Sequence, residues 1–185
     1  MKLLLAVDEN FAIGYQNDLL FHIPEDLKRF KELTTNQIII MGRKTLESLP
    51  NGKPLSHRTN IVLSRNQDLK LPPPHHVVHS KGELFALLQT IDPLKEKEAF
   101  LTGGGNLVKE LIDYCDGAYL TMIHTKVDHA DTHIQNLNKK DGWELLDQSP
   151  SHIYKDLTFS YQTWLNNKVQ TIPKSCSSCQ ACWKH

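Results

Sequence analysis

The chain of 185 residues has no excess charge of either sign and no long hydrophobic run. It carries 21 basic and 21 acidic side chains, so its formal net charge at pH 7 is zero. This balance argues against nucleic acid or a membrane surface as a partner. The apolar run at residues 3–7 is too short for a signal peptide or a membrane span. We therefore expect a cytoplasmic protein that binds neither nucleic acid nor membrane.

Cysteine is scarce, and Cys115 is the only one before residue 176. It lies in a segment with a helical pattern, so we expect it to be an inert core thiol. Potential metal ligands recur every third residue near the end of the chain, at Cys176, Cys179, Cys182 and His185. This spacing would suit zinc or another soft ion. The alternative, which we favour, is a flexible tail without metal, because four ligands so close together would strain a structural zinc site. The ten histidines show no zinc-binding spacing earlier in the chain.

Short apolar runs alternate with helical patterns, and no internal repeat is present. Strands are expected at residues 3–8, 37–41, 60–64, 77–78, 99–102 and 118–123, and a terminal antiparallel pair at 153–154 and 159–165. Helices are expected at 24–33, 43–49, 80–88 and 106–112, and residues 9–21 are predicted to be a loop. This alternation predicts an α/β fold with a mostly parallel sheet. We expect one domain over residues 1–168 and a Cys-rich tail over 169–185.

A carboxylate lies on the apolar side of the first predicted helix, which begins at Pro24. Asp26, Phe30 and Leu33 share one stripe at helical spacing, and Leu27 widens it. A buried carboxylate needs a partner or a shifted pKa, and a cleft for a protonatable ligand would provide the partner. The alternative is a solvated first-turn acid that complements the helix dipole. The segment alone favours this alternative, and the other motifs reverse the preference.

Two strand–glycine–helix joints indicate a dinucleotide site. The first covers residues 38–45 and ends in Gly42, Arg43, Lys44 and Thr45, and the second covers residues 100–106. A single joint of this kind is more often a tight turn, but two in one small sheet favour a dinucleotide. Neither matches a Walker motif or the full Rossmann fingerprint.

Three polar positions each allow a functional and a structural interpretation. Ser64 and Arg65 follow a strand, where they would suit a phosphate monoester and favour NADPH over NADH, or form a solvated loop. Arg58 would anchor a carboxylate, or serve as an edge-strand charge. Thr121 would meet the Asp26 carboxylate, or bond to backbone within its strand.

Taken in order, these residues resemble the dihydrofolate reductase family. The resemblance covers about residues 3–165 and rests on nine tracts, 6–8, 13–24, 26–30, 41–49, 54–55, 58–61, 102–105, 119–121 and 131–133. It implies a single domain with a mixed, mostly parallel sheet of eight strands, about four helices and a C-terminal antiparallel hairpin. It also implies reduction of 7,8-dihydrofolate to tetrahydrofolate with NADPH and binding of antifolate-like small molecules. We expect the protein to be a monomer.

The resemblance also assigns residues to the substrate. Asp26 would bind the pterin and promote protonation of its N5, Thr121 would bond to that carboxylate, and Arg58 would pair with the α-carboxylate of the glutamate tail. Leu19 and Phe21 join Asp26 and Thr121 in the implied catalytic set. The remaining implied substrate contacts are Leu4, Leu27, Phe30, Leu49 and Lys53.

For the cofactor, the resemblance implies a mobile loop at residues 12–20 that closes over the nicotinamide, and a cis peptide at Gly103-Gly104. The implied contacts are Ala6, Ile13, Gly14, Asn17, Asp18, Gly42, Arg43, Lys44, Thr45, Ser64, Arg65, Thr102, Gly103, Gly104, Gly105, Asn106, Leu107 and Thr132.

Three positions depart from the family pattern. Phe21 replaces a tryptophan whose indole N–H would hold an active-site water, Thr102 replaces an aliphatic residue, and Val108 replaces a tyrosine. One alternative is the related riboflavin-pathway pyrimidine reductase, against which Asp26, Phe30 and Arg58 argue. Others are a binding protein with poor turnover and a metal- or thiol-responsive module that acts through the tail.

Overall fold

The computed structural model describes residues 1–173 of the chain. Its main sheet contains β1 (Lys2–Val7), β4 (Ile38–Gly42), β5 (Thr59–Leu63), β6 (His76–Val78), β7 (Ala99–Leu101), β8 (Gly117–Ile123), β10 (Trp143–Gln148) and β12 (Leu157–Asn166). These eight strands lie in the order β10-β12-β8-β1-β7-β4-β5-β6, and β11 (His152–Tyr154) pairs with β12. The six strands from β8 to β6 pair in parallel, whereas β12 is antiparallel to β8, β10 and β11. The predicted mixed α/β fold with a terminal antiparallel hairpin is therefore confirmed.

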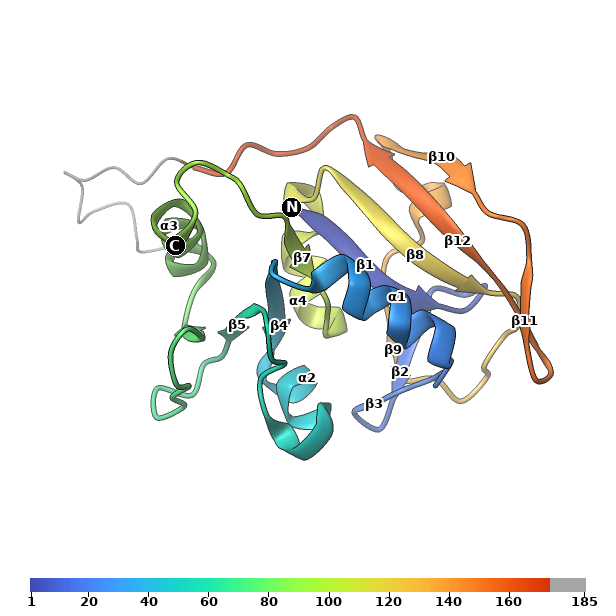
Figure 1. Cartoon of the computed structure of the whole chain (residues 1–185). Coiled ribbons are helices and arrows are strands. Elements are labelled where there is room, and N and C mark those ends of the chain that lie inside the picture. Colours follow the sequence, from blue (N-terminus) through green and yellow to red (C-terminus); the bar gives the residue numbers. More distant parts are fainter. Residues whose placement is uncertain (174–185) are drawn as a thin grey trace.

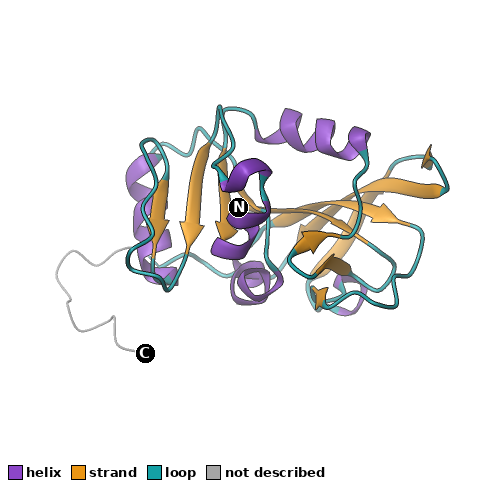
Figure 2. Cartoon of the chain, turned by 90° about the horizontal axis from the view of Figure 1, so that it is seen from below, coloured by secondary structure: helices purple, strands orange, loops and turns teal. Residues whose placement is uncertain are grey.

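Both faces of the parallel part of the sheet are covered by helices (Figure 1 and Figure 2). On one face, Leu46 of α2 (Arg43–Ser48) and Phe30 of α1 (Pro24–Thr34) pack on a cluster that includes Ile39. On the other, α3 (Lys81–Ile91) and α4 (Gly105–Leu111) pack on a cluster that includes Ile38 and Ile40. Because neighbouring strand residues point to opposite faces, a wholly apolar strand such as β4 supplies both clusters.

The prediction of a loop over residues 9–21 was wrong in part. This segment contains β2 (Ala12–Tyr15) and β3 (Asp18–Leu19), which form a small separate sheet with β9 (Thr132–His133). Gln16 and Asn17 turn the chain between β2 and β3 with positive φ angles of 50° and 65°. The strands are too short to show a period, and β9 lies far along the chain, so local sequence gave no signal for this sheet. The edge strand β10 was missed as well.

Asp8 holds the start of this small sheet against the main one. Its carboxylate is fully buried, and its Oδ1 accepts hydrogen bonds of 2.8 Å from the backbone N–H groups of Asn10 and Ala12. Its Oδ2 accepts a bond of 2.9 Å from the N–H of Val127, in the segment after β8. One side chain thus joins the segments that follow β1 and β8.

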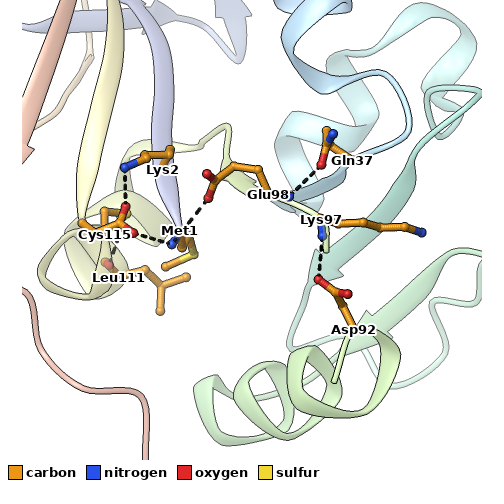
Figure 3. A network of polar contacts seen from close by, with 9 residues as sticks. Met1, Lys2, Gln37, Asp92, Lys97, Glu98, Leu111 and Cys115 are labelled. Carbon is orange, nitrogen blue, oxygen red and sulfur yellow. Dashed lines mark hydrogen bonds and ion pairs between the residues drawn. The ribbon is translucent and has the colours of Figure 1, made fainter. Parts of the chain in front are cut away.

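Polar contacts fix the N-terminal ends of β1 and β7 (Figure 3), whereas the glycine joints follow the C-terminal ends of β4 and β7. The Met1 backbone nitrogen lies 3.8 Å from Glu98 and 3.5 Å from Asp116, and Lys2 Nζ lies 3.0 Å from Asp116. The Glu98 N–H donates to Gln37 Oε1 at 2.6 Å, which ties the lead-in to β7 to that of β4. Both strands that end in glycine joints are therefore held in register at their beginnings.

Three short 3₁₀ helices complete the described elements, η1 (Pro50–Gly52), η2 (Ile112–Tyr114) and η3 (Leu137–Lys139). The segment after β12 continues along the domain, where Ile172 packs against the core and the Gln170 N–H donates to the Asp113 carbonyl at 2.7 Å. Among residues 1–173, no helix has the length and apolar character needed to cross a bilayer.

Candidate active site

The site is built around Asp26, in the first turn of α1. The Thr121 hydroxyl, in the middle of β8, donates a short hydrogen bond to Asp26 Oδ1. Thr121 itself is buried, whereas Asp26 is partly exposed. α1 begins at Pro24 without a side-chain cap, and this start directs Asp26 toward the sheet. The structure thus brings together the two residues that were expected to meet.

The environment of Asp26 changes its acidity. Burial raises the pKa of the Asp26 carboxyl, while the hydrogen bond from Thr121 and the positive charge of Arg29 act in the opposite direction. Desolvation dominates, so the carboxyl binds a proton more readily than a free aspartic acid does. A carboxyl with a raised pKa at the end of a helix, within reach of solvent, is able to polarise or protonate a bound base.

Apolar residues surround this carboxylate on the same face of the sheet. Phe30 and Leu49 pack with buried Leu4 in one cluster, and Phe21 packs in another with Ala6. Two expected contacts, Leu27 and Leu19, are instead exposed over 46% and 50% of their surfaces. Leu27 directly follows Asp26 on α1, and an exposed leucine beside a partly buried carboxylate suits a flat, largely apolar ring.

Arg58 lies between the C-terminal end of α1 and the start of β5. Its Nε donates to the Ser56 carbonyl at 3.0 Å and its Nη1 donates to Thr34 Oγ1 at 3.2 Å. Burial lowers the pKa of the Arg58 guanidinium, which still stays charged at neutral pH. These contacts orient a guanidinium fork for a carboxylate. Lys53 is exposed.

The two glycine joints lie side by side and are bonded to each other. The Gly42 N–H donates to the Gly103 carbonyl at 2.9 Å, so this amide is already paired. Gly103 has a φ of 116°, which favours glycine, and the Gly103–Gly104 peptide is cis, as the resemblance implied. A Cβ on Gly104 would lie 3.4 Å from Thr45 Oγ1. Backbone and a hydroxyl therefore meet closely where β4 and β7 end.

Cationic and hydroxyl groups stand at this edge of the sheet. Arg43, Lys44 and Arg65 are exposed, and Arg43 Nη1 lies 2.5 Å from Glu47 Oε1. Ser64 Oγ is buried and accepts the Asn66 N–H at 3.1 Å, which leaves its own proton free to donate. Cations combined with hydroxyl donors at strand ends fit the phosphate groups of a dinucleotide such as NADPH.

The remaining predicted cofactor residues gather around the small sheet and the start of α4. A Cβ on Gly105 would lie 2.8 Å from Thr132 Cγ2, so β9 packs directly on the second joint. Ile13 packs against the core, and Asn17 and Asp18 are exposed at the β2–β3 turn. Leu107 is buried in α4, while Asn106 is exposed and Thr102 donates its hydroxyl to the Ile40 carbonyl at 3.2 Å.

Sequence reasoning gave no role to several residues that shape the site. The Asp131 carboxylate accepts the Gln16 N–H at 2.8 Å and so ties the β2–β3 turn to β9. The Arg29 guanidinium lies over the rings of Tyr161 and Tyr119. The three-residue spacing from Asp26 to Arg29 on one helix could have indicated that the two side chains are neighbours. The tyrosines could not have been found in this way, because they lie on strands distant in sequence.

The suggested metal ligands Cys176, Cys179, Cys182 and His185 lie outside the described residues. Within residues 1–173, no group of three or more His, Cys, Asp or Glu side chains is arranged to hold a metal ion. Cys115 is fully buried, and desolvation raises the pKa of its thiol to about 12.

Comparison with known proteins agrees with this geometry. The chain matches the family model for dihydrofolate reductase over residues 1–166. It is 31% identical over 180 residues to dihydrofolate reductase type 9 of Escherichia coli, which covers 94% of this chain and 97% of the relative. It is 38% identical over 144 residues to the dihydrofolate reductase of Haemophilus influenzae, covering 78% of this chain and 83% of that one.

A solved structure of dihydrofolate reductase from Enterococcus faecalis, complexed with NADP(H) and RAB-propyl, superimposes with a TM-score of 0.76. Its sequence is 32% identical, and the match covers 90% of this chain and 95% of that chain. Fold, family model and full-length relatives agree, and the chain therefore belongs to the dihydrofolate reductase family.

Proposed function

We propose that the protein reduces 7,8-dihydrofolate to 5,6,7,8-tetrahydrofolate with NADPH, and that Asp26 is the carboxylate that prepares the pterin for reduction. Family membership supports the reaction and the cofactor. The observation that carries the residue assignment is the partly buried Asp26 carboxylate, which is held in place by the Thr121 hydroxyl. The tetrahydrofolate produced would supply one-carbon transfer reactions.

The reaction adds one hydride to C6 and one proton to N5 of the pterin. NADPH supplies the hydride when bound, and the chain's own residues orient the ring and manage the proton. When ionised, the Asp26 carboxylate attracts positive charge onto the pterin and so favours protonation at N5, and the burial that raises its pKa also leaves this charge weakly screened by solvent. Thr121 holds the carboxylate in one orientation, so that no reorganisation is needed during the reaction.

The substrate would lie along α1. Leu4, Leu27, Phe30 and Leu49 provide the apolar surroundings of its rings, and the exposed Leu27 and Leu19 side chains become covered on binding. Arg58 pairs with the α-carboxylate of the glutamate tail, and Lys53 adds positive charge nearby. Phe21 stands where the family places a tryptophan and offers no N–H to hold a water.

The cofactor would lie across the two glycine joints. Arg43, Lys44, Thr45, Ser64 and Arg65 provide the donors for its phosphates. Ala6, Ile13, Gly14, Asn17 and Asp18 would lie toward the nicotinamide, with residues 12–20 as the mobile loop. The joint residues Gly42, Thr102, Gly103, Gly104, Gly105, Asn106 and Leu107, together with Thr132, complete this set.

The test is loss of NADPH absorbance in the presence of dihydrofolate, with an Asp26→Asn variant as the matched control. We expect dihydrofolate-dependent oxidation in the native protein and a loss of roughly 100-fold or more in kcat for the variant at neutral pH. The affinity for NADPH should be unchanged, because Asp26 lies on the substrate side. Native turnover in the variant would refute the role of Asp26, and binding of both ligands without turnover would indicate a binding protein.

We also propose that the protein works as a monomer in the cytoplasm, with small molecules and not nucleic acid as ligands. The zero formal charge supports the last point. We assign the activity to a domain over residues 1–168, with 169–185 as a tail that the reaction does not need. Sedimentation of the native chain tests the first statement, and turnover after removal of residues 169–185 tests the last.

A further inference from the structure

Arg29 lies over Tyr161 of β12, whereas the glycine joints follow β7 and β4, on the other side of β8 in the strand order. It lies three residues after Asp26 on α1, so the two side chains are neighbours on the helix surface. Its guanidinium carbon lies 4.4 Å from the centre of the Tyr161 ring and 5.8 Å from that of Tyr119. The charge is therefore held against two aromatic faces.

The strand register shows why these rings point toward Asp26. Tyr161 of β12 is the direct partner of Thr121 of β8 in the antiparallel pair. Tyr119 precedes Thr121 by two residues on β8, so all three side chains share one face of the sheet. Thr121 is also the residue that bonds to Asp26. The rings that hold Arg29 and the hydroxyl that holds Asp26 thus form one continuous surface.

Arg29 has unused capacity on this surface. Its Nη1 atom is buried and has no hydrogen-bond partner among residues 1–173. Arg29 forms no ion pair within 4 Å in this part of the chain, although Lys28, next to it, lies 3.9 Å from Glu32. An unpaired cation beside an acid acts on that acid through space, and a half-buried position such as that of Arg29 makes this action stronger than it would be in bulk water.

We propose that Arg29 is a positioning residue for the reduction of dihydrofolate, which acts through Asp26 as a fixed positive charge and determines the pH range of the reaction. This inference rests on the proposed role of Asp26. It does not require contact between Arg29 and either ligand. The electrostatics of Asp26 support this role, because the charge of Arg29 lowers the pKa of Asp26 whereas burial raises it.

Other charged groups also face Arg29. On α1 these are Glu25, Lys28 and Glu32, which line a hollow of about 620 Å³ together with His152 of β11 and Tyr161 of β12. Glu25 and Glu32 carry charge opposite to that of Arg29, and Lys28 carries charge of the same sign. The hollow exposes the outer side of Arg29 to solvent ions, so added salt should weaken its effect on Asp26.

The sign of the effect follows from the reaction. Because the reaction consumes a proton, its rate falls as the pH rises through the apparent pKa of Asp26 and the bound pterin. Removing the positive charge of Arg29 favours the protonated state of Asp26 and the bound pterin. The falling limb of the pH profile should therefore move to higher pH, by roughly half a pH unit to one pH unit.

The experiment measures the pH dependence of the hydride-transfer rate, by stopped flow, in the full chain and in Arg29→Gln and Arg29→Lys variants. Lys28→Gln is the matched control, because it removes the same charge from an adjacent side chain that is 77% exposed. We expect a shift for Arg29→Gln, a profile near that of the native protein for Arg29→Lys, and no shift for Lys28→Gln. Arg29→Met, which keeps an apolar stem against the tyrosine rings, is used if Arg29→Gln fails to fold.

A merely structural role for Arg29 would lower the rate equally at all pH values and leave the midpoint in place. An unmoved midpoint, or the same shift in Lys28→Gln, overturns the proposal while leaving the proposed function intact. Absence of dihydrofolate-dependent oxidation in the native protein overturns both. In the native protein the midpoint should also rise at about 1 M salt, and the neutral Arg29 variants should lack most of this response.

Discussion

The substrate side and the cofactor side of this site hold their charges in different ways. On the substrate side, Asp26 is bonded to Thr121, and Arg58 is bonded to Thr34 and to the Ser56 carbonyl. On the cofactor side, Arg43 pairs with Glu47 of its own helix, whereas Lys44 and Arg65 are exposed, with no ion pair among residues 1–173.

This difference separates chemistry from recognition. A group that stabilises charge during a reaction acts best when it is already oriented, because reorganisation then costs nothing at that moment. Side chains that only bind phosphates become ordered when the ligand binds. Their mobility in the free protein lowers the affinity for the ligand but does not lower kcat. Substitutions on the two sides should therefore affect different kinetic constants.

The largest effect that sharpens this comparison is expected at Arg58. Arg58→Gln removes the charge proposed to pair with the glutamate carboxylate, and we expect the KM for dihydrofolate to rise roughly 30-fold because a charge-assisted pair would be lost. The KM for NADPH should not change. Steady-state kinetics with dihydropteroate, which lacks the glutamate, provide the control. An equal loss with that substrate would contradict the pairing of Arg58 with the tail.

A steric change on the cofactor side should have the next largest effect. Gly105→Ala places a Cβ 2.8 Å from Thr132 Cγ2 and 3.2 Å from the His133 carbonyl. We expect a loss of about 1–3 kcal/mol in the free energy of unfolding, measured by denaturant titration, and weaker binding of NADPH.

Thr132→Ser provides a matched test of this contact. It removes the Cγ2 methyl but keeps the hydroxyl that donates to Asp131 at 2.8 Å. Added to Gly105→Ala, it should restore part of the lost stability, a coupling that a double-mutant cycle measures. Strict additivity of the two substitutions would show that the methyl group is not the obstacle.

A smaller effect is expected at Arg65, among the exposed cations. Arg65→Ala should reduce the preference for NADPH over NADH about tenfold, because the guanidinium is proposed to meet the phosphate monoester that NADH lacks. The change should appear in the KM for NADPH, with kcat and the KM for NADH unaltered. A native protein that used both cofactors equally would contradict the phosphate site.

The smallest effect concerns stability on the substrate side. In the folded state the pKa of Asp26 is raised above its unfolded value, so folding favours the protonated form. The ionised carboxylate therefore destabilises the fold once the pH has risen from below the unfolded pKa, 3.8, through the folded pKa. Asp26→Asn should raise Tm at pH 7 by about 2 °C, and this gain should disappear at pH values below the unfolded pKa. Equal Tm values at both pH values would contradict a destabilising carboxylate.

Much of the fold was accessible from local sequence, because its central strands are short and mostly apolar. β4 and β5, for example, alternate with helices whose starts are marked by Pro24 or by glycine. The pairing of Asp26 with Thr121 followed from resemblance, since 95 residues separate the two and no local pattern joins them. The sequence showed that Thr121 is a polar residue within an apolar strand, but it did not show that Asp26 is its partner.

The rest depended on contacts between distant and weakly patterned segments. β2, β3 and β9 have two to four residues each, too few for a period, and their pairing is supported by the Asp131 carboxylate. Arg29 looked like an ordinary charge of an amphipathic helix until the register of β8 and β12 placed two tyrosine rings beneath it.

The buried carboxylate of Asp8 has a consequence for motion. It accepts backbone N–H groups from Ala12 and from Val127, which lie on the segments that follow β1 and β8. Opening either segment breaks bonds to the same side chain and leaves a charge buried without full compensation. In hydrogen exchange, the amides of Ala12 and Val127 should therefore exchange together at a common rate, as parts of one cooperative unit, while the amides of the β2–β3 turn exchange much faster.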